Sequence, residues 1–195
     1  MKTLTLIRHG ATAGNLEKRY IGRTDEPLCP LGIAQAERLR EQGFFVDALF
    51  VSPALRARQT AQLVFPNMPY TVVDGLMETD FGMFEGKCAQ ELQNDPFYQA
   101  WLGSDCLGPV PGGESAAEFK PRCCSAFYTA AQALPEHARA AFVIHGGVIM
   151  AILEAYASPP RGFYESHVGN GEFVQCEYDG RMLRIVGGAL YRQGE

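Results

Sequence analysis

Short strand-like runs and segments of helical periodicity alternate along this chain. Strand-like runs rich in apolar residues stand at positions 3–7, 48–51, 70–73 and 141–144, which predicts four strands. Between these runs, apolar residues recur three or four positions apart, as one face of a helix requires. Because alternating strands and helices build a layered sheet, the order predicts an α/β fold, a three-layer α/β/α sandwich with a mostly parallel sheet.

Four segments carry the helical pattern, at 30–39, 57–64, 115–134 and 148–156. Pro30 stands where the first of them should begin, a position that tolerates the missing N–H of proline. The chain closes with two strand-like runs, 172–178 and 182–186, around Asp179-Gly180. This dipeptide is typical of a hairpin turn, so the last two strands predict an antiparallel edge of the sheet.

The region from about 76 to 111 has the least regular pattern. Glycines and Pro109 interrupt it, and it contains the aromatic residues Phe97, Tyr98 and Trp101. A long stretch without strands inside a compact domain is typical of a functional insertion, so we predict a small helical cap. The aromatic residues would form the core of this cap or stack on the heterocyclic base of a ligand. A length of 195 residues predicts one domain, 1–195, that includes the cap.

Composition narrows the classes of partner. With 47% hydrophobic and 20% charged residues, the chain is typical of a soluble globular protein. Its net charge of -5 gives no electrostatic reason to bind nucleic acid or an anionic membrane, and neither is expected. The six cysteines lack Cys-x-x-Cys spacing, which predicts free thiols rather than disulfides or zinc ligands. No signal-peptide core or membrane-spanning run is visible, so we expect a cytoplasmic protein, as a monomer or a homodimer.

Two of the predicted strands end in a histidine followed by a glycine. The first runs into Arg8-His9-Gly10 and the fourth into His145-Gly146. Ligands collect at the carboxyl ends of strands in an open α/β sheet, so both histidines are expected at one edge. A single histidine after a strand is more often a satisfied loop or core residue. Two of them, one beside an arginine, are hard to assign to packing, because buried polar groups need partners. We therefore expect an anion site.

The sequence offers four side chains for such a site: Arg8, His9, Arg56 and His145. Arginine matches two phosphate oxygens at once, and two arginines with an imidazolium can hold a dianion and spread the charge of a transferring phosphoryl group. The pocket would need neither a metal nor a cofactor. Asn15 would add a neutral donor, and the small Gly10 and Gly146 would let backbone N–H groups approach the anion.

Residues 8–15 resemble the Arg-His-Gly-x-Thr-x-x-Asn signature of the histidine phosphatase (phosphoglycerate mutase-like) superfamily. Four further segments agree in order: Gly22-x-x-Asp25-x-Pro27-Leu28, Ser52-Pro53-x-x-Arg56-x-x-x-Thr60-Ala61, Glu78-x-x-Phe81-Gly82-x-x-Glu85-Gly86 and His145-Gly146-Gly147. The resemblance spans nearly the whole chain and implies the phosphoglycerate mutase-like fold. Ala11 departs from it, since glutamate is common there, but this removes no attacking or phosphate-binding group.

The resemblance implies a role for each residue of the pocket. His9 matches the nucleophile, which forms a phosphohistidine that water then hydrolyses. Arg8, Arg56 and His145 match the phosphate binders, and Asn15 is a further contact. The attacking imidazole must be neutral with one nitrogen free, which requires its other nitrogen to donate a hydrogen bond to a fixed acceptor.

Glu78 matches the position of the acid that protonates the leaving alkoxide. A carboxylic acid beside bound phosphate can keep its proton, because the two groups would otherwise carry like charge. Asp80 and Glu85 are nearby alternatives, and Glu78 could also be a solvated loop residue. Glu85 fits better as a structural residue that holds the turn at 81–82.

The compact chain predicts hydrolysis rather than isomerisation, since mutases of the superfamily tend to be longer and retain a bisphosphate. Segments 19–28, 80–86 and 111–115 are similar to those of bacterial α-ribazole-5'-phosphate phosphatases, which implies hydrolysis of that small-molecule phosphate ester in cobalamin biosynthesis. The loop and cap residues expected near the substrate are Gly22, Thr24, Gly146 and Trp101. Alternatives are a broad-specificity small-metabolite phosphatase, a phosphoglycerate mutase and, from another class, a non-catalytic phospholigand-binding protein.

Overall fold

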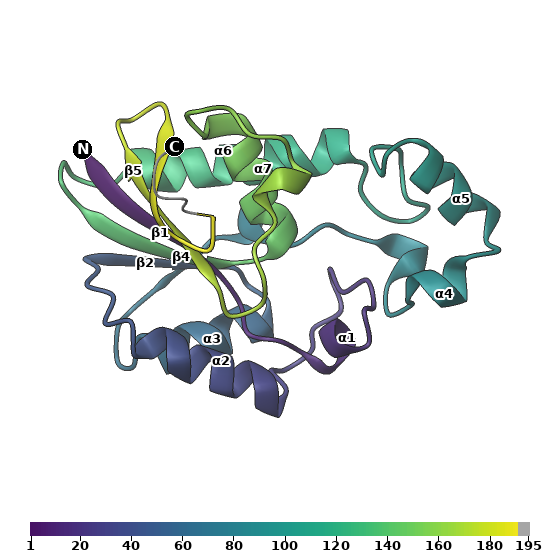
Figure 1. The fold of residues 1–195 in the computed structure, drawn as a ribbon, viewed down its shortest axis with the longest axis horizontal. Helices are drawn as coiled ribbons and strands as arrows, with labels where there is room; N and C mark the ends of the chain where they lie inside the picture. The colour runs from purple at the N-terminus through teal and green to yellow at the C-terminus, as the bar shows by residue number, and fades with distance from the viewer. Residues whose placement is uncertain (191–195) are drawn as a thin grey trace.

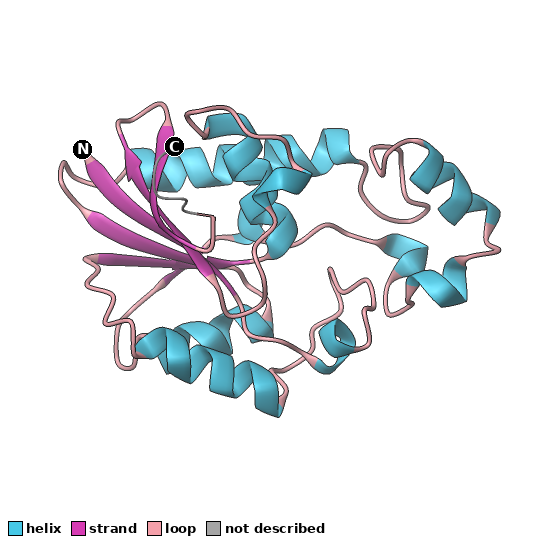
Figure 2. Ribbon diagram, in the orientation of Figure 1, coloured by secondary structure: helices cyan, strands magenta, loops and turns pink. Residues whose placement is uncertain are grey.

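A computed structural model describes residues 1–190 and contains a six-stranded sheet in the order β3-β2-β4-β1-β5-β6. The strands are β1 (Lys2–Arg8), β2 (Ala48–Val51), β3 (Thr71–Val72), β4 (Arg139–Ile144), β5 (Phe173–Tyr178) and β6 (Leu183–Gly188). β1, β4, β2 and β3 run parallel, whereas β5 and β6 pair antiparallel at the other edge. The predicted α/β fold is confirmed, including its antiparallel edge (Figure 2).

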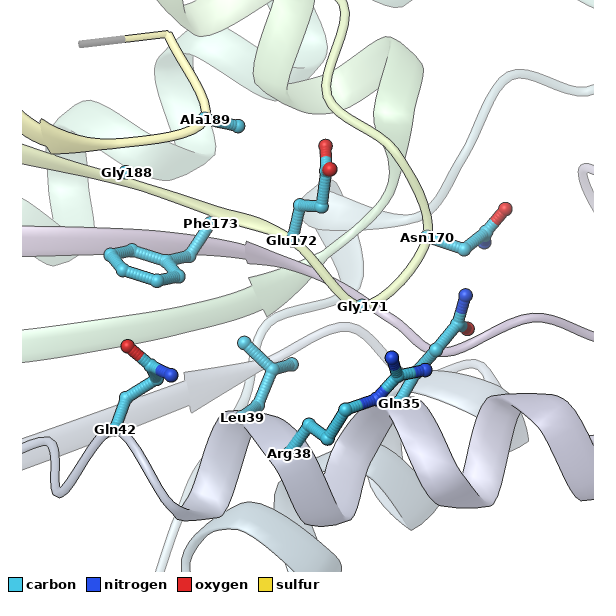
Figure 3. Close-up of a pocket in the computed structure, with 10 residues that line it drawn as sticks. All are labelled: Gln35, Arg38, Leu39, Gln42, Asn170, Gly171, Glu172, Phe173, Gly188 and Ala189. Carbon is cyan, nitrogen blue, oxygen red and sulfur yellow. The ribbon is translucent and has the colours of Figure 1, made fainter.

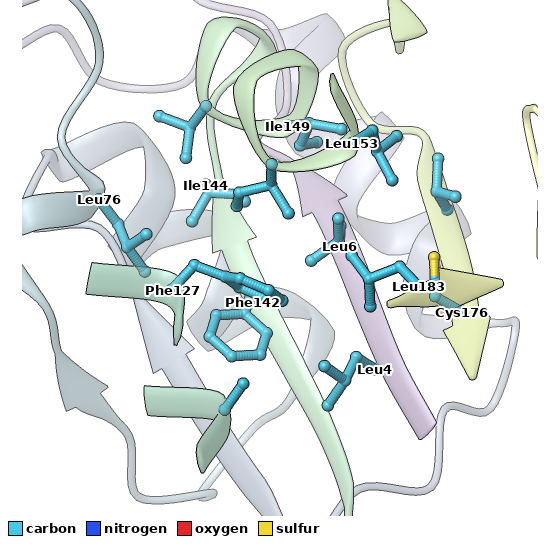
Figure 4. Packing of buried hydrophobic residues seen from close by; sticks show 14 of the residues in the cluster. Leu4, Leu6, Leu76, Phe127, Phe142, Ile144, Ile149, Leu153, Cys176 and Leu183 are labelled. Atoms are coloured by element: carbon cyan, nitrogen blue, oxygen red, sulfur yellow. The ribbon is translucent and has the colours of Figure 1, made fainter. Parts of the chain in front are cut away.

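Two pairs of helices cover the two faces of the sheet (Figure 1). One pair is α2 (Pro30–Arg40) and α3 (Leu55–Val64), and the other is α6 (Ala116–Gln132) and α7 (Gly146–Tyr156). Alternation along β4 divides the core between them. Phe142 and Ile144 pack with α6 and α7, in the cluster that Figure 4 shows, while Val143 packs with α2 and α3. Both faces of the central strands are therefore apolar, which explains their continuous hydrophobic runs.

The register of the central strands brings the two histidine segments together. β1 and β4 are parallel neighbours, with Arg8 opposite Ile144, and the backbone N–H of His9 donates to the carbonyl of Ile144 at 3.0 Å. His9 and His145 therefore leave the sheet side by side at its carboxyl edge, as the sequence predicts.

Short helices fill the region between β3 and α6. They are the 3₁₀ turns η1 (Asp74–Leu76) and η2 (Gly82–Phe84), then α4 (Ala89–Leu92) and α5 (Pro96–Gly103), and the last two extend away from the sheet (Figure 1). A separate apolar cluster of Phe84, Tyr98 and Trp101 holds them together. The prediction that Phe97 joins this cluster is wrong, because Phe97 is 54% exposed. Tyr98 and Trp101 are buried with Phe84, whereas the side chain of Phe97, in the first turn of the same helix, is left to solvent.

Two other differences from the predicted elements are local. The polar loop after β1 contains a short helix, α1 (Ala13–Leu16), which begins where the Thr12 hydroxyl accepts from the backbone N–H of Asn15. Its signal is the Thr12-x-x-Asn15 spacing of a capping box. β3 is shorter than expected, and a 3₁₀ turn, η3 (Tyr164–Ser166), lies between α7 and β5.

Candidate active site

His9 directly follows β1 and is 3% exposed. Its Nδ1 lies 2.7 Å from the carbonyl oxygen of Gly10, and because a carbonyl only accepts, Nδ1 carries the proton. Arg56 Nε donates to Nε2 of His9 at 3.2 Å, which requires a lone pair there. Burial, followed by the charges of Arg56 and Arg8, holds the pKa of His9 well below its ordinary value. The imidazole is therefore neutral with a lone pair on Nε2, as a nucleophile requires.

Arg56 is fully buried and fixed by the loop that follows α1. Its Nη1 donates to the carbonyl of Thr24 at 2.9 Å and its Nη2 to that of Gly22 at 2.8 Å. Gly22 and Thr24, expected near the substrate, thus act on Arg56 through their backbone carbonyls. A Cβ on Gly22 would lie 1.7 Å from the carbonyl oxygen of Thr79, so only glycine fits this packing.

Glu85 holds the same loop from its other side. Its carboxylate accepts from the backbone N–H groups of Gly22, Arg23 and Thr24 and from the Thr24 hydroxyl. Burial would raise its pKa, but these bonds hold the pKa of Glu85 below its ordinary value. It also accepts from the N–H of Phe81, at 3.1 Å. Glu85 therefore has the structural role expected from the sequence, and it holds the loop at 22–24 as well as the turn at 81–82.

Arg8 lies on the other side of His9. Its Nη1 donates to the carbonyl of Val168 at 2.7 Å, while Nε is buried and has no partner within residues 1–190. A Cβ on Gly146 would come within 3.1 Å of Arg8 Cζ, so glycine lets the start of α7 pack against this guanidinium. That backbone N–H groups reach an anion here stays a prediction. The equivalent expectation for Gly10 is wrong, because its N–H donates to the Thr60 hydroxyl at 3.1 Å.

His145 is fully buried, and its ring centroid lies 5.1 Å from that of His9. Its Nε2 is 2.6 Å from the hydroxyl oxygen of Ser52. Its Nδ1 has no partner among the described residues, although it is shielded from solvent. An unpartnered buried nitrogen beside the His9 imidazole indicates that a ligand completes the site. The sequence shows Ser52 only as one residue of a motif. No local pattern identifies it as a hydrogen-bond partner of a histidine.

Glu78 is 9% exposed and lies between η1 and η2. Its Oε2 accepts from the N–H of Gly147 at 2.9 Å, and its Oε1 from the N–H of Thr79 at 2.9 Å. The carboxyl group therefore lies beside the segment that carries His145. Asp80, the alternative acid, accepts from the N–H of Gly82, and Glu85 is committed to the loop described above. Of the three acidic residues, Glu78 is therefore the one whose carboxyl group lies beside the His145 segment, while Asp80 and Glu85 bind backbone N–H groups of loops and turns.

Asn15 is oriented by a residue that sequence reasoning missed. Its Oδ1 accepts from the N–H of Thr12 at 3.1 Å and from Nδ2 of Asn170 at 3.1 Å. Both contacts require an oxygen, so the amide orientation is fixed and Nδ2 of Asn15 remains available as a donor. Asn170 also donates to the carbonyl of His9 at 3.2 Å. An Asn-Gly pair before a strand resembles an ordinary turn, which explains why its pattern gave no signal.

A cavity of about 310 Å³ opens beside Glu78 and Gly147. Its walls are mostly aromatic and apolar side chains from the loop after α1, the cap, α6, α7 and the segment around η3: Tyr20, Phe81, Trp101, Phe119, Met150, Phe163 and Tyr164. Trp101 thus belongs both to the cap core and to the cavity wall. Besides Glu78, the charged groups that line it are paired: Glu114 with Arg122 and Lys120 with Glu154, both at 2.7 Å. A ligand group that lies here would meet apolar surface, paired charges and the carboxyl group of Glu78.

A second cavity, of about 370 Å³, lies between α2 and the segment that leads into β5 (Figure 3). Gln35 on α2 and the segment 170–172 line it together. The same residues hold the loop, because Gln35 accepts from the N–H of Ala11 at 2.8 Å and the N–H of Gly171 donates to the carbonyl of His9 at 3.1 Å. The backbone of His9 is therefore supported from two directions.

Residues 1–190 contain no group of three or more His, Cys, Asp and Glu side chains arranged to hold a metal ion. None of the helices in this same stretch has the length and apolarity needed to span a bilayer. All six cysteines are free thiols.

The family model of the histidine phosphatase superfamily (branch 1) matches residues 4–188 of the chain. A curated relative, "Putative phosphoserine phosphatase 2" of Hydrogenobacter thermophilus, is 34% identical over 95% of this chain and 94% of that protein. The structure of the alpha-ribazole phosphatase from Shigella flexneri has a TM-score of 0.83 at 26% identity and covers 94% of this chain and 95% of that one. The structure of phosphoglycerate mutase from Thermus thermophilus has a TM-score of 0.74 at 33% identity, with 95% and 97% covered.

Proposed function

The chain belongs to the histidine phosphatase superfamily, branch 1, and on that premise we propose that it is a phosphomonoesterase in which His9 carries the phosphoryl group from substrate to water. One observation carries the proposal. His9 is held as a neutral imidazole with its lone pair on Nε2, while Arg8 Nε and His145 Nδ1 are buried beside it without partners within residues 1–190. A phosphoryl group supplies the acceptors that these nitrogens lack.

In the first step Nε2 of His9 attacks phosphorus, and the bond from phosphorus to the ester oxygen breaks. Arg56 Nε, which otherwise donates to Nε2 of His9, turns to a phosphoryl oxygen. Arg8, His145 and Asn15 bind the other oxygens and spread the charge that develops on them. Glu78 gives its proton to the departing alkoxide, so that a neutral alcohol leaves.

In the second step water attacks the phosphohistidine, Glu78 takes a proton from that water, and the bond from Nε2 to phosphorus breaks. Inorganic phosphate leaves, and both His9 and Glu78 return to their starting states. The two arginines provide positive charge and His145 provides an N–H donor, so we propose that the reaction needs neither a metal nor a cofactor. The free cysteines agree with the reducing cytoplasm expected from the sequence.

For the substrate we propose α-ribazole 5'-phosphate, a benzimidazole riboside. The cavity beside Glu78 supports this proposal, because its aromatic walls suit a flat apolar base and its lysine is already paired with Glu154. A phosphoglycerate or phosphoserine leaving group would bring a carboxylate into this cavity. That carboxylate would lose hydration without gaining an unpaired cation, so both esters should be poorer substrates.

A phosphate-release screen tests the substrate and the chemistry together. Purified enzyme with EDTA is given α-ribazole phosphate, 3-phosphoglycerate, phosphoserine and sugar phosphates, and kcat/KM is compared. We expect the highest value for α-ribazole phosphate and no effect of EDTA. Mass spectrometry of quenched samples should detect an acid-labile phosphate on His9 and none in the His9→Ala variant. Activity lost in EDTA, or a steady interconversion of phosphoglycerates, would overturn the proposal in favour of metal chemistry or a mutase.

A further inference from the structure

Ser52 is a fully buried hydroxyl directly after β2, and its Oγ lies 2.6 Å from Nε2 of His145. Two other groups reach the same oxygen. The backbone N–H of Ala54 donates to it at 3.4 Å, and Sδ of Met77 lies 3.7 Å away as an acceptor. The hydroxyl thus has one fixed donor, one weak acceptor and one imidazole nitrogen that can play either part, depending on its protonation.

These contacts satisfy Ser52 in both charge states of His145. When the imidazole is neutral with its proton on Nδ1, Ser52 accepts from Ala54 and donates to Nε2. When the imidazole is protonated, Nε2–H donates to Ser52, and the hydroxyl proton turns to Met77 Sδ. Nδ1 carries a proton in both states, and it is the nitrogen that is buried without a partner in the described part of the chain.

We propose that Ser52 and Met77 form a positioning pair that keeps the Nδ1–H of His145 directed at the phosphoryl group and lets His145 gain a proton when phosphate binds. Ser52 acts through His145, and Met77 acts through Ser52, so neither touches the reacting atoms. The proposal rests on the phosphate site described under the proposed function.

The charges around His145 explain why such a device is needed. The groups that face it are Arg56 from α3, Arg8 from β1, His9 directly after β1 and Arg122 from α6, together with the Glu78 carboxyl group at Gly147. Burial, then the charges of Arg56, His9, Arg8 and Arg122, holds the pKa of His145 well below its ordinary value. A bound phosphate dianion reverses this balance by placing negative charge among these groups. The partner of Nε2 must therefore change from donor to acceptor as the site fills.

Removing the hydroxyl should leave Nε2 buried without a partner. In the Ser52→Ala variant the imidazole can move its proton to either nitrogen, and a lone pair on Nδ1 would repel the anion. We expect kcat/KM for p-nitrophenyl phosphate to fall about 10- to 100-fold. Ser52→Thr retains the hydroxyl and should recover most of this loss, provided that it melts as the wild type does.

Met77→Leu conserves volume and removes only the sulfur acceptor. Because sulfur accepts weakly, we expect a loss of about two- to fivefold, confined to the acidic side of the pH profile where His145 is charged in the complex. Ser52→Ala should lower activity at every pH. This difference in the pH profile separates a positioning role from a general packing defect, which would weaken both variants evenly.

Ring-nitrogen NMR tests the pair without turnover, since the chain has only four histidines to assign. With inorganic phosphate bound, His145 of the wild type should show protons on both nitrogens up to a higher pH than in Met77→Leu or Ser52→Ala. A His145 that stays neutral in the phosphate complex, or titrates identically in all three proteins, would overturn the inference. Absence of a phosphohistidine during turnover would instead overturn the proposed function and leave the NMR result standing.

Discussion

Glu78 and Gly147 are joined by a hydrogen bond of 2.9 Å, in which the Gly147 N–H donates to Oε2 of the carboxyl group. Gly147 lies in the first turn of α7, where helix N–H groups have no partner within the helix. A Cβ at this position would lie 2.4 Å from Oε1 of Glu78. The glycine therefore leaves room for the carboxyl group between His145 and the apolar cavity.

Glu78→Gln should slow poor leaving groups far more than good ones. An alkoxide must be protonated as it departs, whereas nitrophenolate is stable enough to leave with little protonation. Glutamine retains the size of the side chain but cannot protonate a leaving group. We expect a loss of about 10²- to 10⁴-fold on an alkyl phosphate such as α-ribazole phosphate and under about tenfold on p-nitrophenyl phosphate. Steady-state kinetics on both esters measures the ratio. Equal losses would exclude Glu78 as the acid.

Gly147→Ala should reproduce part of this selectivity without changing any ionisable group. The added Cβ collides with the carboxyl group of Glu78, which must move away from the ester oxygen. We expect a larger loss on alkyl phosphates than on p-nitrophenyl phosphate. Gly103→Ala is the matched control, because a Cβ there meets no atom within 4 Å. If both variants behave alike, the contact between residues 78 and 147 has no catalytic importance.

Phe163→Leu tests the assignment of the cavity to the leaving group. Phe163 is partly buried in the cavity wall, and the Nζ of Lys120 lies 4.4 Å from its ring centroid. Loss of an aromatic contact is worth about 0.5–1.5 kcal/mol, so kcat/KM for α-ribazole phosphate or phenyl phosphate should fall about 2- to 13-fold. Glycerol phosphate, which has no ring, should be hydrolysed at nearly the wild-type rate. A uniform loss would place the base elsewhere.

The fold and the ends of its central strands could be predicted because they depend on hydrophobic periodicity, which is local in the sequence. The register of Arg8 with Ile144 follows once these strands are neighbours. Asn170 could not be predicted, since it acts on His9 across 161 positions through one amide. The wrong expectations for Gly10 and Phe97 have a similar origin. Each depends on which neighbour the tertiary structure provides, Thr60 for the first and solvent for the second.

Asn170→Ala should weaken phosphate binding through Asn15. Without the donor from residue 170, the Asn15 amide loses one of the two contacts that fix its orientation, and its Nδ2 is no longer held toward the anion. We expect the inhibition constant of inorganic phosphate to rise about tenfold, the value of one hydrogen bond to a charged group. Asn94→Ala, on the exposed surface of the cap, is the control. Unchanged inhibition would assign residue 170 to loop structure alone.

His9 and His145 should make the protein lose stability as pH falls. The pKa of each is held well below its ordinary value in the fold, first by burial and then by neighbouring charges that include Arg56 and Arg8. The unfolded chain, with ordinary histidine pKa values of about 6.5, then binds more protons than the folded chain at every pH between the two values. The free energy of unfolding therefore decreases as pH drops below about 6.5. Above this pH neither histidine makes the free energy of unfolding depend on pH.

Thermal unfolding between pH 8 and pH 5 measures this effect by comparing the wild type with His145→Gln, which cannot take up a proton. Each unit of separation between the folded and unfolded pKa is worth about 1.4 kcal/mol, or about 3–5 °C for a chain of this size. The melting temperature of the wild type should therefore fall more steeply with acid than that of the variant. His137→Asn, at an exposed position with positive φ, should keep the wild-type slope. Parallel curves for the wild type and His145→Gln would mean that His145 takes up its proton over the same pH range in the folded and unfolded protein, so that folding does not lower its pKa.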